Sequence, residues 1–235
     1  MSEWILSIDL STPEGIVTLE GYGKLLHREV AAASRVSGLF VEAGELLSLA
    51  AIKSTDIGAI GAARGPGSFT GIRVAVMAAK TLAVTLGVPL AAPDSLEVIA
   101  EGCRGIVEAV MVASDARRGE VYYGLYHLDE PAPKVLERPQ VAKPEAAVAC
   151  LLQWQDRLGE KIGLAGSALA AYPAAWPRDV LLIEETGPGP MGLSGLCRAY
   201  HELGRVEEPL ELMPLYLRRP DARESVSLPG GAPCA

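Results

Sequence analysis

The chain has 235 residues, of which 49% are hydrophobic and 21% are charged. This composition supplies a large buried core, and it excludes an intrinsically disordered chain. The excess of 29 acidic over 21 basic residues gives a formal charge of −8, which argues against a protein that grips nucleic acid or an anionic membrane by itself.

The N-terminal stretch MSEWILSIDLST has none of the features of a targeting segment. It carries acids at Glu3 and Asp9, no basic residue, and an apolar run too short for a signal peptide or a membrane span. The four cysteines include no CxxC pair, so their spacing predicts neither a zinc knuckle nor a disulfide framework. We expect a cytoplasmic protein.

The first half of the chain predicts three strands, a helix, a strand and a second helix. Short connections between the first three strands favour an antiparallel meander. Gly87 and Pro89 mark the end of the second helix. In order, these elements are strands 4–10, 16–21 and 25–31, helix 36–52, strand 57–63 and helix 70–86.

After a short helix over 95–102, the same order of elements is predicted again. It consists of strands 107–115, 121–128 and 134–142, helix 144–158, strand 161–166 and helix 191–203. Each copy places an aspartate, Asp9 or Asp115, at the end of its first strand. The repeated order predicts a two-lobed α/β fold, the duplicated ribonuclease-H-like fold of actin and sugar kinases. We expect lobes at 1–103 and 104–223 and a flexible tail at 224–235.

The stretch GPGSFTG, residues 65–71, is rich in glycine but fits neither common phosphate-binding loop. A Walker loop needs a lysine where Ile72 stands, and a dinucleotide loop needs GxGxxG rather than GxGxxxG. Pro66 also removes one N–H group that an anion would need. We interpret Ser68 or Thr70 as the N-cap of the helix that follows.

That helix has a ridge of small residues that another element could approach closely. The ridge consists of Gly71, Ala75, Ala79 and Ala83. Only two residues of the helix, Arg73 and Lys80, are charged, so most of its surface is too apolar to face water. Periodicity alone leaves open whether the helix is buried inside an α/β layer or against a partner.

Other residues suggest chemistry only weakly. Asp9 and Asp115 could hold Mg²⁺ near a nucleotide phosphate in a cleft, although turn formation alone explains an aspartate at a strand end. HELGR has Arg205 where a zinc-protease motif needs its second histidine, and no GxSxG is present. The arginines of ARRGE and YLRRPDARE could contact phosphate, but the net charge of −8 favours solvated turns.

Five segments together carry a family resemblance. They are ILSIDLST (5–12), GPGSFTGIRVAVMAAKTLA (65–83), PDSLEVIAEG (93–102), SDARRGEVYYGLY (114–126) and PLYLRRPDAR (214–223). In this order they resemble the TsaB family, the non-catalytic subunits of the bacterial machinery that makes threonylcarbamoyladenosine in tRNA. The resemblance implies an actin-like fold related to that of the catalytic subunit, TsaD.

The resemblance also implies a scaffold role. TsaB forms a heterodimer with TsaD and a homodimer when alone, with TsaE as a further component and tRNA contacted only indirectly. TsaD transfers the threonylcarbamoyl group to N6 of adenosine 37 in tRNAs that read ANN codons. TsaD-type enzymes bind a metal through two histidines on the helix after the GPG helix, whereas residues 95–99 here contain none. We expect no catalytic residue, metal site or intrinsic cofactor, and any nucleotide at the interface of the assembled complex.

By this resemblance, a partner interface is expected on the helix after GPGSFTG. Its residues are Gly71, Ile72, Arg73, Ala75, Val76, Ala79, Lys80 and Ala83. Ala79→Arg is expected to block pairing while leaving the monomer folded.

A vestigial nucleotide site is expected at Asp9, Ser11, Thr12 and Asp115. Two alternative functions stay open. One is an independent ATPase or small-molecule kinase that uses Asp9 and Asp115, and the other is a glycoprotease-like hydrolase with no nominated nucleophile.

Overall fold

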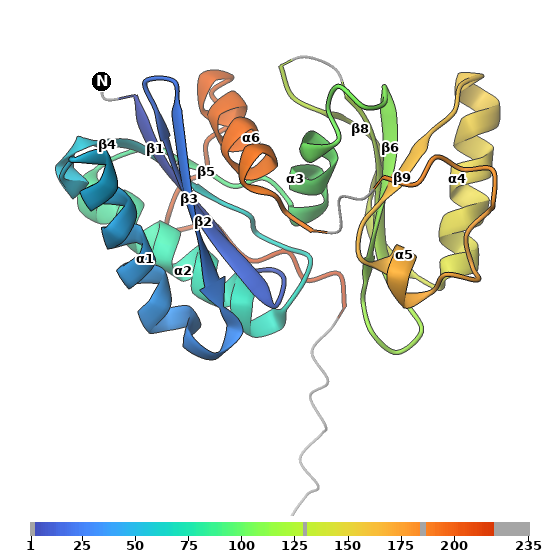
Figure 1. Cartoon of the computed structure of the whole chain (residues 1–235), viewed down its shortest axis with the longest axis horizontal. Coiled ribbons are helices and arrows are strands. Elements are labelled where there is room, and N and C mark those ends of the chain that lie inside the picture. Colours follow the sequence, from blue (N-terminus) through green and yellow to red (C-terminus); the bar gives the residue numbers. More distant parts are fainter. Residues whose placement is uncertain (1–2, 129–130, 184–186, 219–235) are drawn as a thin grey trace, which may run out of the picture.

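Two β-sheets define the two lobes of the molecule (Figure 1). The computed structural model describes residues 3–128, 131–183 and 187–218. The first sheet has the order β3-β2-β1-β4-β5, and its strands are β1 (Trp4–Asp9), β2 (Glu14–Gly21), β3 (Lys24–Ala31), β4 (Ile57–Ala62) and β5 (Leu90–Ala91). The second sheet has the order β8-β7-β6-β9, and its strands are β6 (Ala109–Asp115), β7 (Val121–His127), β8 (Lys134–Ala142) and β9 (Gly163–Ala165).

Both sheets are paired in the same way. In the first, β1, β2 and β3 form an antiparallel meander, and β4 pairs in parallel with the free edge of β1. In the second, β6, β7 and β8 form the meander, and β9 pairs in parallel with β6. The repeated topology confirms the duplicated ribonuclease-H-like fold that the order of elements predicts.

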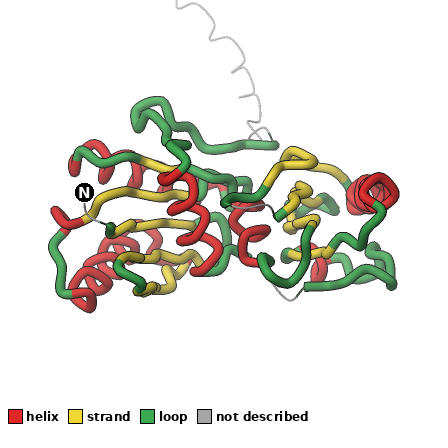
Figure 2. Tube along the Cα trace, turned by 90° about the horizontal axis from the view of Figure 1, so that it is seen from above, coloured by secondary structure: helices red, strands yellow, loops and turns green. Residues whose placement is uncertain are grey.

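The helices form three layers around the two sheets. They are α1 (Arg35–Ala50), α2 (Phe69–Leu86), α3 (Ser95–Gly102), α4 (Pro144–Leu158), α5 (Ala168–Ala171) and α6 (Pro190–Glu202). Helices α1 and α2 cover the outer face of the first sheet, and α4 and α5 cover the outer face of the second. Helices α3 and α6 lie between the sheets, as the views from the side and from above both show (Figures 1 and 2).

The two central helices are exchanged between the lobes. Helix α3 follows β5 in the chain but packs on the second sheet, where Leu96 and Ile99 join Val110 and Val112 in one apolar cluster. Helix α6 follows the second sheet but packs on β1, β2 and β4 of the first. The predicted lobe boundary at 103/104 stays a prediction, and these two helices pack across it.

The segment after α6 ties the lobes together a second time. Its Glu207 N–H donates to the Leu90 carbonyl at 2.8 Å, and its Leu215 N–H donates to the Arg64 carbonyl at 2.7 Å. Farther along, Arg218 reaches the second lobe and donates to the Ala116 carbonyl at 2.9 Å. The predicted tail at 224–235 lies outside the described residues.

The structure gives nearly every predicted element, with ends shifted by a few residues. Of the two residues predicted as the N-cap of α2, Ser68 takes this position, and its Oγ accepts from the Gly71 N–H. Strand β5 and helix α5 were not predicted, because two and four residues are too short to show a period.

The small-residue ridge of α2 faces the first sheet. Ala75, Ala79 and Ala83 are at most 1% exposed, and a Cβ at Gly71 would overlap the Leu10 carbonyl oxygen at the end of β1. The ridge therefore lets the helix approach the sheet closely. This answers the open question in favour of core packing for the ridge.

The predicted interface residues on α2 need a correction for the same reason. Six of them are buried inside the monomer and are not accessible to a partner in this fold: Gly71, Ile72, Ala75, Val76, Ala79 and Ala83. Only Arg73 and Lys80 reach the surface. By length and composition α2 could also cross a membrane, with a mean hydropathy of 1.4, and 39% of it is buried inside the molecule, where its ridge packs on the first sheet.

The two central helices touch through a glycine. A Cβ at Gly192 of α6 would collide with the Val98 carbonyl oxygen of α3 and lie 3.0 Å from the Gly102 nitrogen. Gly195, one turn along the same helix, has only the flexible end of Glu101 nearby, at 3.9 Å. The two glycines therefore form a matched pair, one in the helix contact and one outside it.

We predict that Gly192→Ala lowers the free energy of unfolding by about 1–3 kcal/mol, because overpacking against backbone forces α3 and α6 apart. Gly195→Ala should be neutral or stabilising by up to about 1 kcal/mol, since alanine favours the helix. Urea unfolding followed by circular dichroism measures both. Equal effects of the two substitutions would show that close α3–α6 contact is not what Gly192 provides.

Candidate functional site

A cleft of about 960 Å³ opens between the lobes at the ends of β1 and β6. Three helices begin at its wall, with Phe69 of α2, Ser95 of α3 and Pro190 of α6 among the lining residues. Because helix N-termini carry partial positive charge, this arrangement favours an anion over a cation. The location is the one at which the two halves of a duplicated α/β fold present their strand ends.

Charged side chains in the cleft are mostly arginines. The basic lining residues are Arg35, Arg117, Arg118 and Arg218, and the acidic ones are Glu14, Glu29 and Asp115. Arg35 is already engaged, because it donates to Ser68 Oγ at 2.7 Å and to the Thr12 carbonyl at 2.6 Å. It joins the turn after β1 to the start of α2, so its first role is to hold the cleft wall together.

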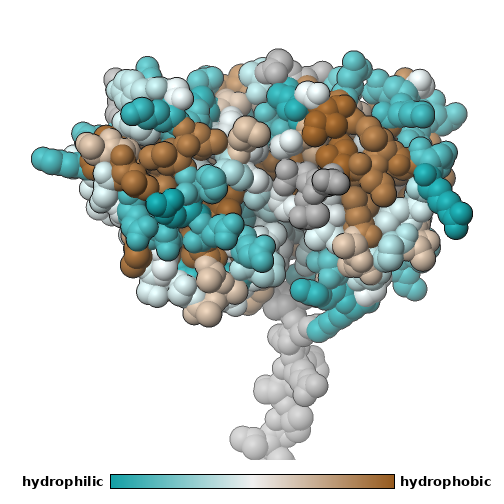
Figure 3. Space-filling view, in the orientation of Figure 1, coloured by the Kyte–Doolittle hydropathy of each residue, from teal (hydrophilic) through white to brown (hydrophobic). Residues whose placement is uncertain are grey.

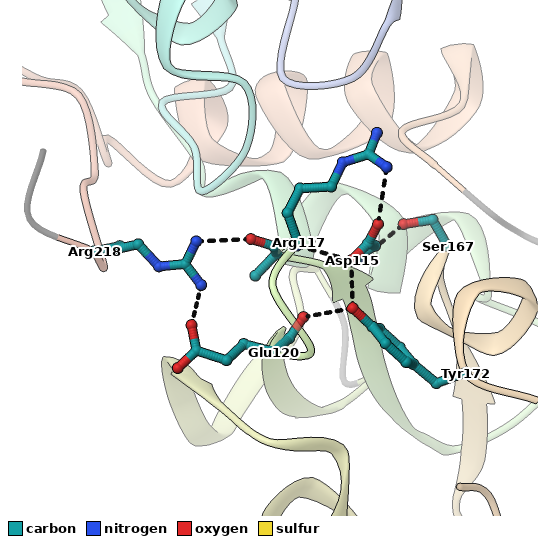
Figure 4. Close-up of polar contacts among 7 residues, drawn as sticks. Asp115, Arg117, Glu120, Ser167, Tyr172 and Arg218 are labelled. Atoms are coloured by element: carbon teal, nitrogen blue, oxygen red, sulfur yellow. Dashed lines mark hydrogen bonds and ion pairs between the residues drawn. The ribbon is translucent and has the colours of Figure 1, made fainter. Parts of the chain in front are cut away.

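Asp115 is held in a network at the end of β6 (Figure 4). Its Oδ1 accepts from the Arg117 N–H at 2.8 Å and from the Tyr172 hydroxyl at 2.9 Å, and its Oδ2 lies 3.3 Å from the Arg117 guanidinium. Nearby, Arg218 pairs with Glu120 and donates to the Ala116 carbonyl. Both carboxylate oxygens of Asp115 are thus occupied by protein donors, which leaves the residue poorly placed to take a magnesium ion.

Asp9, at the equivalent end of β1, is buried rather than lining the cleft. It is 1% exposed, and its Oδ1 accepts from the Ser11 N–H at 2.6 Å. Burial raises the pKa of Asp9 to about 6, and the hydrogen bond from the Ser11 N–H offsets part of this rise. Ser11, Thr12 and Asp115 line the cleft, so the structure brings three of the four predicted nucleotide-site residues to its wall and places Asp9 outside the lining.

Behind the cleft, α3 carries two further buried acids. Asp94 caps the helix by accepting from the Glu97 N–H at 2.8 Å, and it also accepts from the Tyr126 hydroxyl at 3.1 Å. Glu97 accepts from the Tyr200 hydroxyl of α6 at 2.6 Å. Burial and the charge of Asp94 raise the pKa of Glu97 to about 7, and burial raises the pKa of Asp94. These acids link α3 to α6 and to the second sheet rather than facing the cleft.

Sequence reasoning found part of this site. It singled out the two aspartates and the ARRGE turn, because a strand end and a basic run are visible locally. It missed Arg35, Ser95, Ser167 and Tyr172, whose sequence neighbours give no signal and which reach the site only through the fold.

The raised pKa of Asp9 gives a stability prediction. The unfolded aspartate titrates near 3.8 and the folded one near 6, so between these values the folded state binds more protons and wild-type stability falls as the pH rises. Asp9→Asn removes this cost while keeping an oxygen for the Ser11 N–H. We predict that D9N is more stable than wild type above pH 7, by up to about 3 kcal/mol, and that the advantage disappears below pH 4.

Urea unfolding at pH 4 and pH 7.5 measures this difference. Asp115→Asn is the control at the equivalent strand end, and it should show no gain at pH 7.5 because it loses the ion pair with Arg117. A D9N variant less stable than wild type at pH 7.5 would contradict the prediction, because it would mean that neighbouring groups in the fold stabilise the ionised carboxylate of Asp9.

Comparisons with known proteins place this chain in a family. A family model described as TsaD, tRNA N6-adenosine threonylcarbamoyltransferase, matches residues 28–172. The chain is 48% identical over 71 residues to the tRNA threonylcarbamoyladenosine biosynthesis protein TsaB of Bacillus subtilis, covering 30% of this chain and 31% of the relative. It is 33% identical over 129 residues to the TsaB of Escherichia coli, covering 54% of this chain and 56% of the relative. These matches span about a third and about half of the two relatives' own lengths.

A solved structure extends the similarity to nearly the whole chain. It is the crystal structure of an uncharacterized protein from Pseudomonas aeruginosa with similarity to peptidase YEAZ. The two chains are 30% identical, with a TM-score of 0.81, and the match covers 93% of this chain and 100% of the other. Similarity at this level covers both sheets and the two helices between them.

Proposed function

The chain belongs to the TsaB branch of the TsaD-like family, and from this premise we propose that it is a scaffold and dimerisation subunit that supports TsaD. The reaction supported is the formation of N6-threonylcarbamoyladenosine at position 37 of tRNAs that read ANN codons. In this proposal the chain works in the cytoplasm, pairs with TsaD in a complex that also contains TsaE, and forms a homodimer when alone. It contacts tRNA only indirectly, and it contributes no catalytic residue.

The observation that carries the proposal is the exposed apolar surface of the outer helices of the first lobe. On α1 and α2, seven large apolar side chains are between 40% and 62% exposed: Val36, Phe40, Val41, Leu49, Phe69, Met77 and Val84. In the space-filling view, apolar residues gather in two areas, one over each lobe (Figure 3). Covering such residues removes apolar surface from water and lowers the free energy, so they support a partner on these helices.

This surface replaces the small-residue ridge as the proposed interface on α2. The ridge faces the sheet, whereas Phe69, Arg73 and Met77 lie on the opposite, solvent side of the same helix. Arg73 stacks over the Phe69 ring at 3.9 Å and donates to the Tyr216 hydroxyl at 2.8 Å, which holds these exposed groups in place. A preorganised apolar and aromatic surface suits a stable partner.

A scaffold role also fits the residue types found in α3. Residues 95–99 contain no histidine, and Glu97, the acid among them, is 2% exposed and bonded to Tyr200. The rival function, an independent ATPase or kinase, needs Asp9 and Asp115 at a shared magnesium ion. The burial of Asp9 and the paired oxygens of Asp115 give that rival less support. A glycoprotease-like hydrolase has no nominated nucleophile.

The cleft supports a narrower second proposal, which is nucleotide binding in the assembled complex. Its arginines and the starts of three helices favour a phosphate group, without a catalytic pair of aspartates. Such a nucleotide would act as a structural ligand between the lobes.

We predict that Met77→Arg weakens the complex with TsaD of the same organism by about tenfold or more, because it places an unpaired charge in an apolar interface. Met77 is 59% exposed, so the monomer should fold normally. Size-exclusion chromatography with light scattering measures the mass of each mixture, and a one-to-one heterodimer is expected for the wild type.

Two variants make this test specific. Leu152→Arg makes the same kind of change at a 50% exposed site on α4 of the second lobe, and it should pair normally. Ala79→Arg, which the sequence led us to expect to leave the monomer folded, should instead fail to fold, since Ala79 is fully buried in the first core. Loss of pairing in L152R but not in M77R would move the interface to the second lobe.

A further inference from the structure

The second sheet brings three potential metal ligands together at the end remote from the cleft. Glu108 directly precedes β6, His127 is the last residue of β7, and Glu160 lies three residues before β9. Because β7 runs antiparallel to β6 and β9 runs parallel to it, these three positions meet at one end of the sheet. The cleft lies at the other end of β6, roughly 20 Å away for a strand of this length.

The ligand atoms of the three side chains already lie close together. One oxygen of each glutamate and one nitrogen of His127 are all within 4.8 Å of one another. His127 Nε2 and Glu160 Oε1 are 3.9 Å apart, which is too long for a hydrogen bond. Two ligands of one ion with bonds of about 2.0–2.2 Å can stand at that separation.

Backbone pairing fixes where these side chains start. Ala109 and His127 are partners in the β6–β7 ladder, and the Leu128 N–H donates to the Glu108 carbonyl at 2.7 Å. Val110 pairs with Gly163, which sets the register of the segment that carries Glu160. The backbone is therefore ordered before any ion binds, and only side-chain rotation is needed to close the site.

Within the part of the chain that the structure describes, no lysine or arginine forms an ion pair with Glu108 or Glu160, and the basic group beside Glu160 is the His127 imidazole at 3.9 Å. The Glu160 side chain is 31% exposed, but its Oε1 atom is shielded from solvent and has no hydrogen-bond partner. A buried carboxylate oxygen without a donor is costly, and two neighbouring carboxylates repel each other. A divalent cation would remove both costs.

We propose that Glu108, His127 and Glu160 bind one divalent transition-metal ion, with Zn²⁺ as the best match. An imidazole nitrogen with two carboxylates suits Zn²⁺ and its neighbours, whereas Mg²⁺ and Ca²⁺ take oxygen ligands. The ion would join the starts of β6 and β9 to the end of β7, and so stabilise the outer end of the second sheet. This site is independent of TsaD and of the interlobe cleft.

The test uses Co²⁺ as a spectroscopic probe, with the full chain first freed of metal by a chelator. We expect one Co²⁺ per chain, visible d–d absorption, a raised melting temperature, and displacement of Co²⁺ by Zn²⁺. His127→Gln and Glu160→Gln should each weaken binding by more than the roughly 10- to 100-fold that loss of an outer-shell partner costs. Glu145→Gln, which removes a carboxylate from α4 of the same lobe, should bind Co²⁺ like the wild type.

Circular dichroism of the metal-free variants separates loss of the site from loss of the fold. The proposal is overturned if the wild type binds no stoichiometric Co²⁺. It is equally overturned if folded H127Q and E160Q bind as tightly as the wild type, because the ion would then sit elsewhere.

Discussion

Helices α3 and α6 pack against each other in the middle of the molecule and hold the two lobes together. Each of these helices packs on the sheet of the opposite lobe, and they meet where Gly192 faces the backbone of α3. A side chain at that point would push the two sheets apart and open the cleft between them. The exchange therefore makes the lobes mutually dependent, with the segment after α6 as a second tie.

The same contact determines the chemistry of the central layer. Asp94 and Glu97 are buried there and bonded to Tyr126 and Tyr200, so α3 uses its acids to join helices and sheets. These groups hold the layer together. Burial makes their ionised forms costly in free energy, which raises their pKa values. Because these two acids are bonded inside the molecule, neither is exposed to bind a substrate, which agrees with the proposed scaffold role. The proposed function therefore rests on the outer surface of the first lobe.

The sequence predicted the fold well because the fold is repeated. Two meanders, each ending its first strand at an aspartate, are visible locally, and the structure confirms them. The direction in which the α2 ridge faces was not predictable, because small residues every fourth position suit a sheet and a partner helix equally well. Only the position of Leu10 beneath Gly71 decides between them.

The parts of the site that sequence reasoning missed share one property, which is distance along the chain. Arg35 meets Ser68, and Tyr172 meets Asp115, across separations of 33 and 57 residues. Likewise, Glu108, His127 and Glu160 belong to three different strand ends, so no spacing in the sequence resembles a metal motif. Exposure is equally invisible in the sequence, and the apolar surface of α1 and α2 was recognised only once the buried faces of both helices were known.

In the proposed function, the chain enables a reaction that it does not perform. The most direct measurement is the formation of N6-threonylcarbamoyladenosine in an ANN-reading tRNA, with TsaD, TsaE and the threonylcarbamoyl adenylate supplied, in the presence and absence of this chain. A scaffold role predicts no product with this chain as the only protein, and much faster formation when it joins TsaD and TsaE. Product made by this chain without TsaD, or a rate unchanged by its addition, would show that the chain is not a scaffold for TsaD.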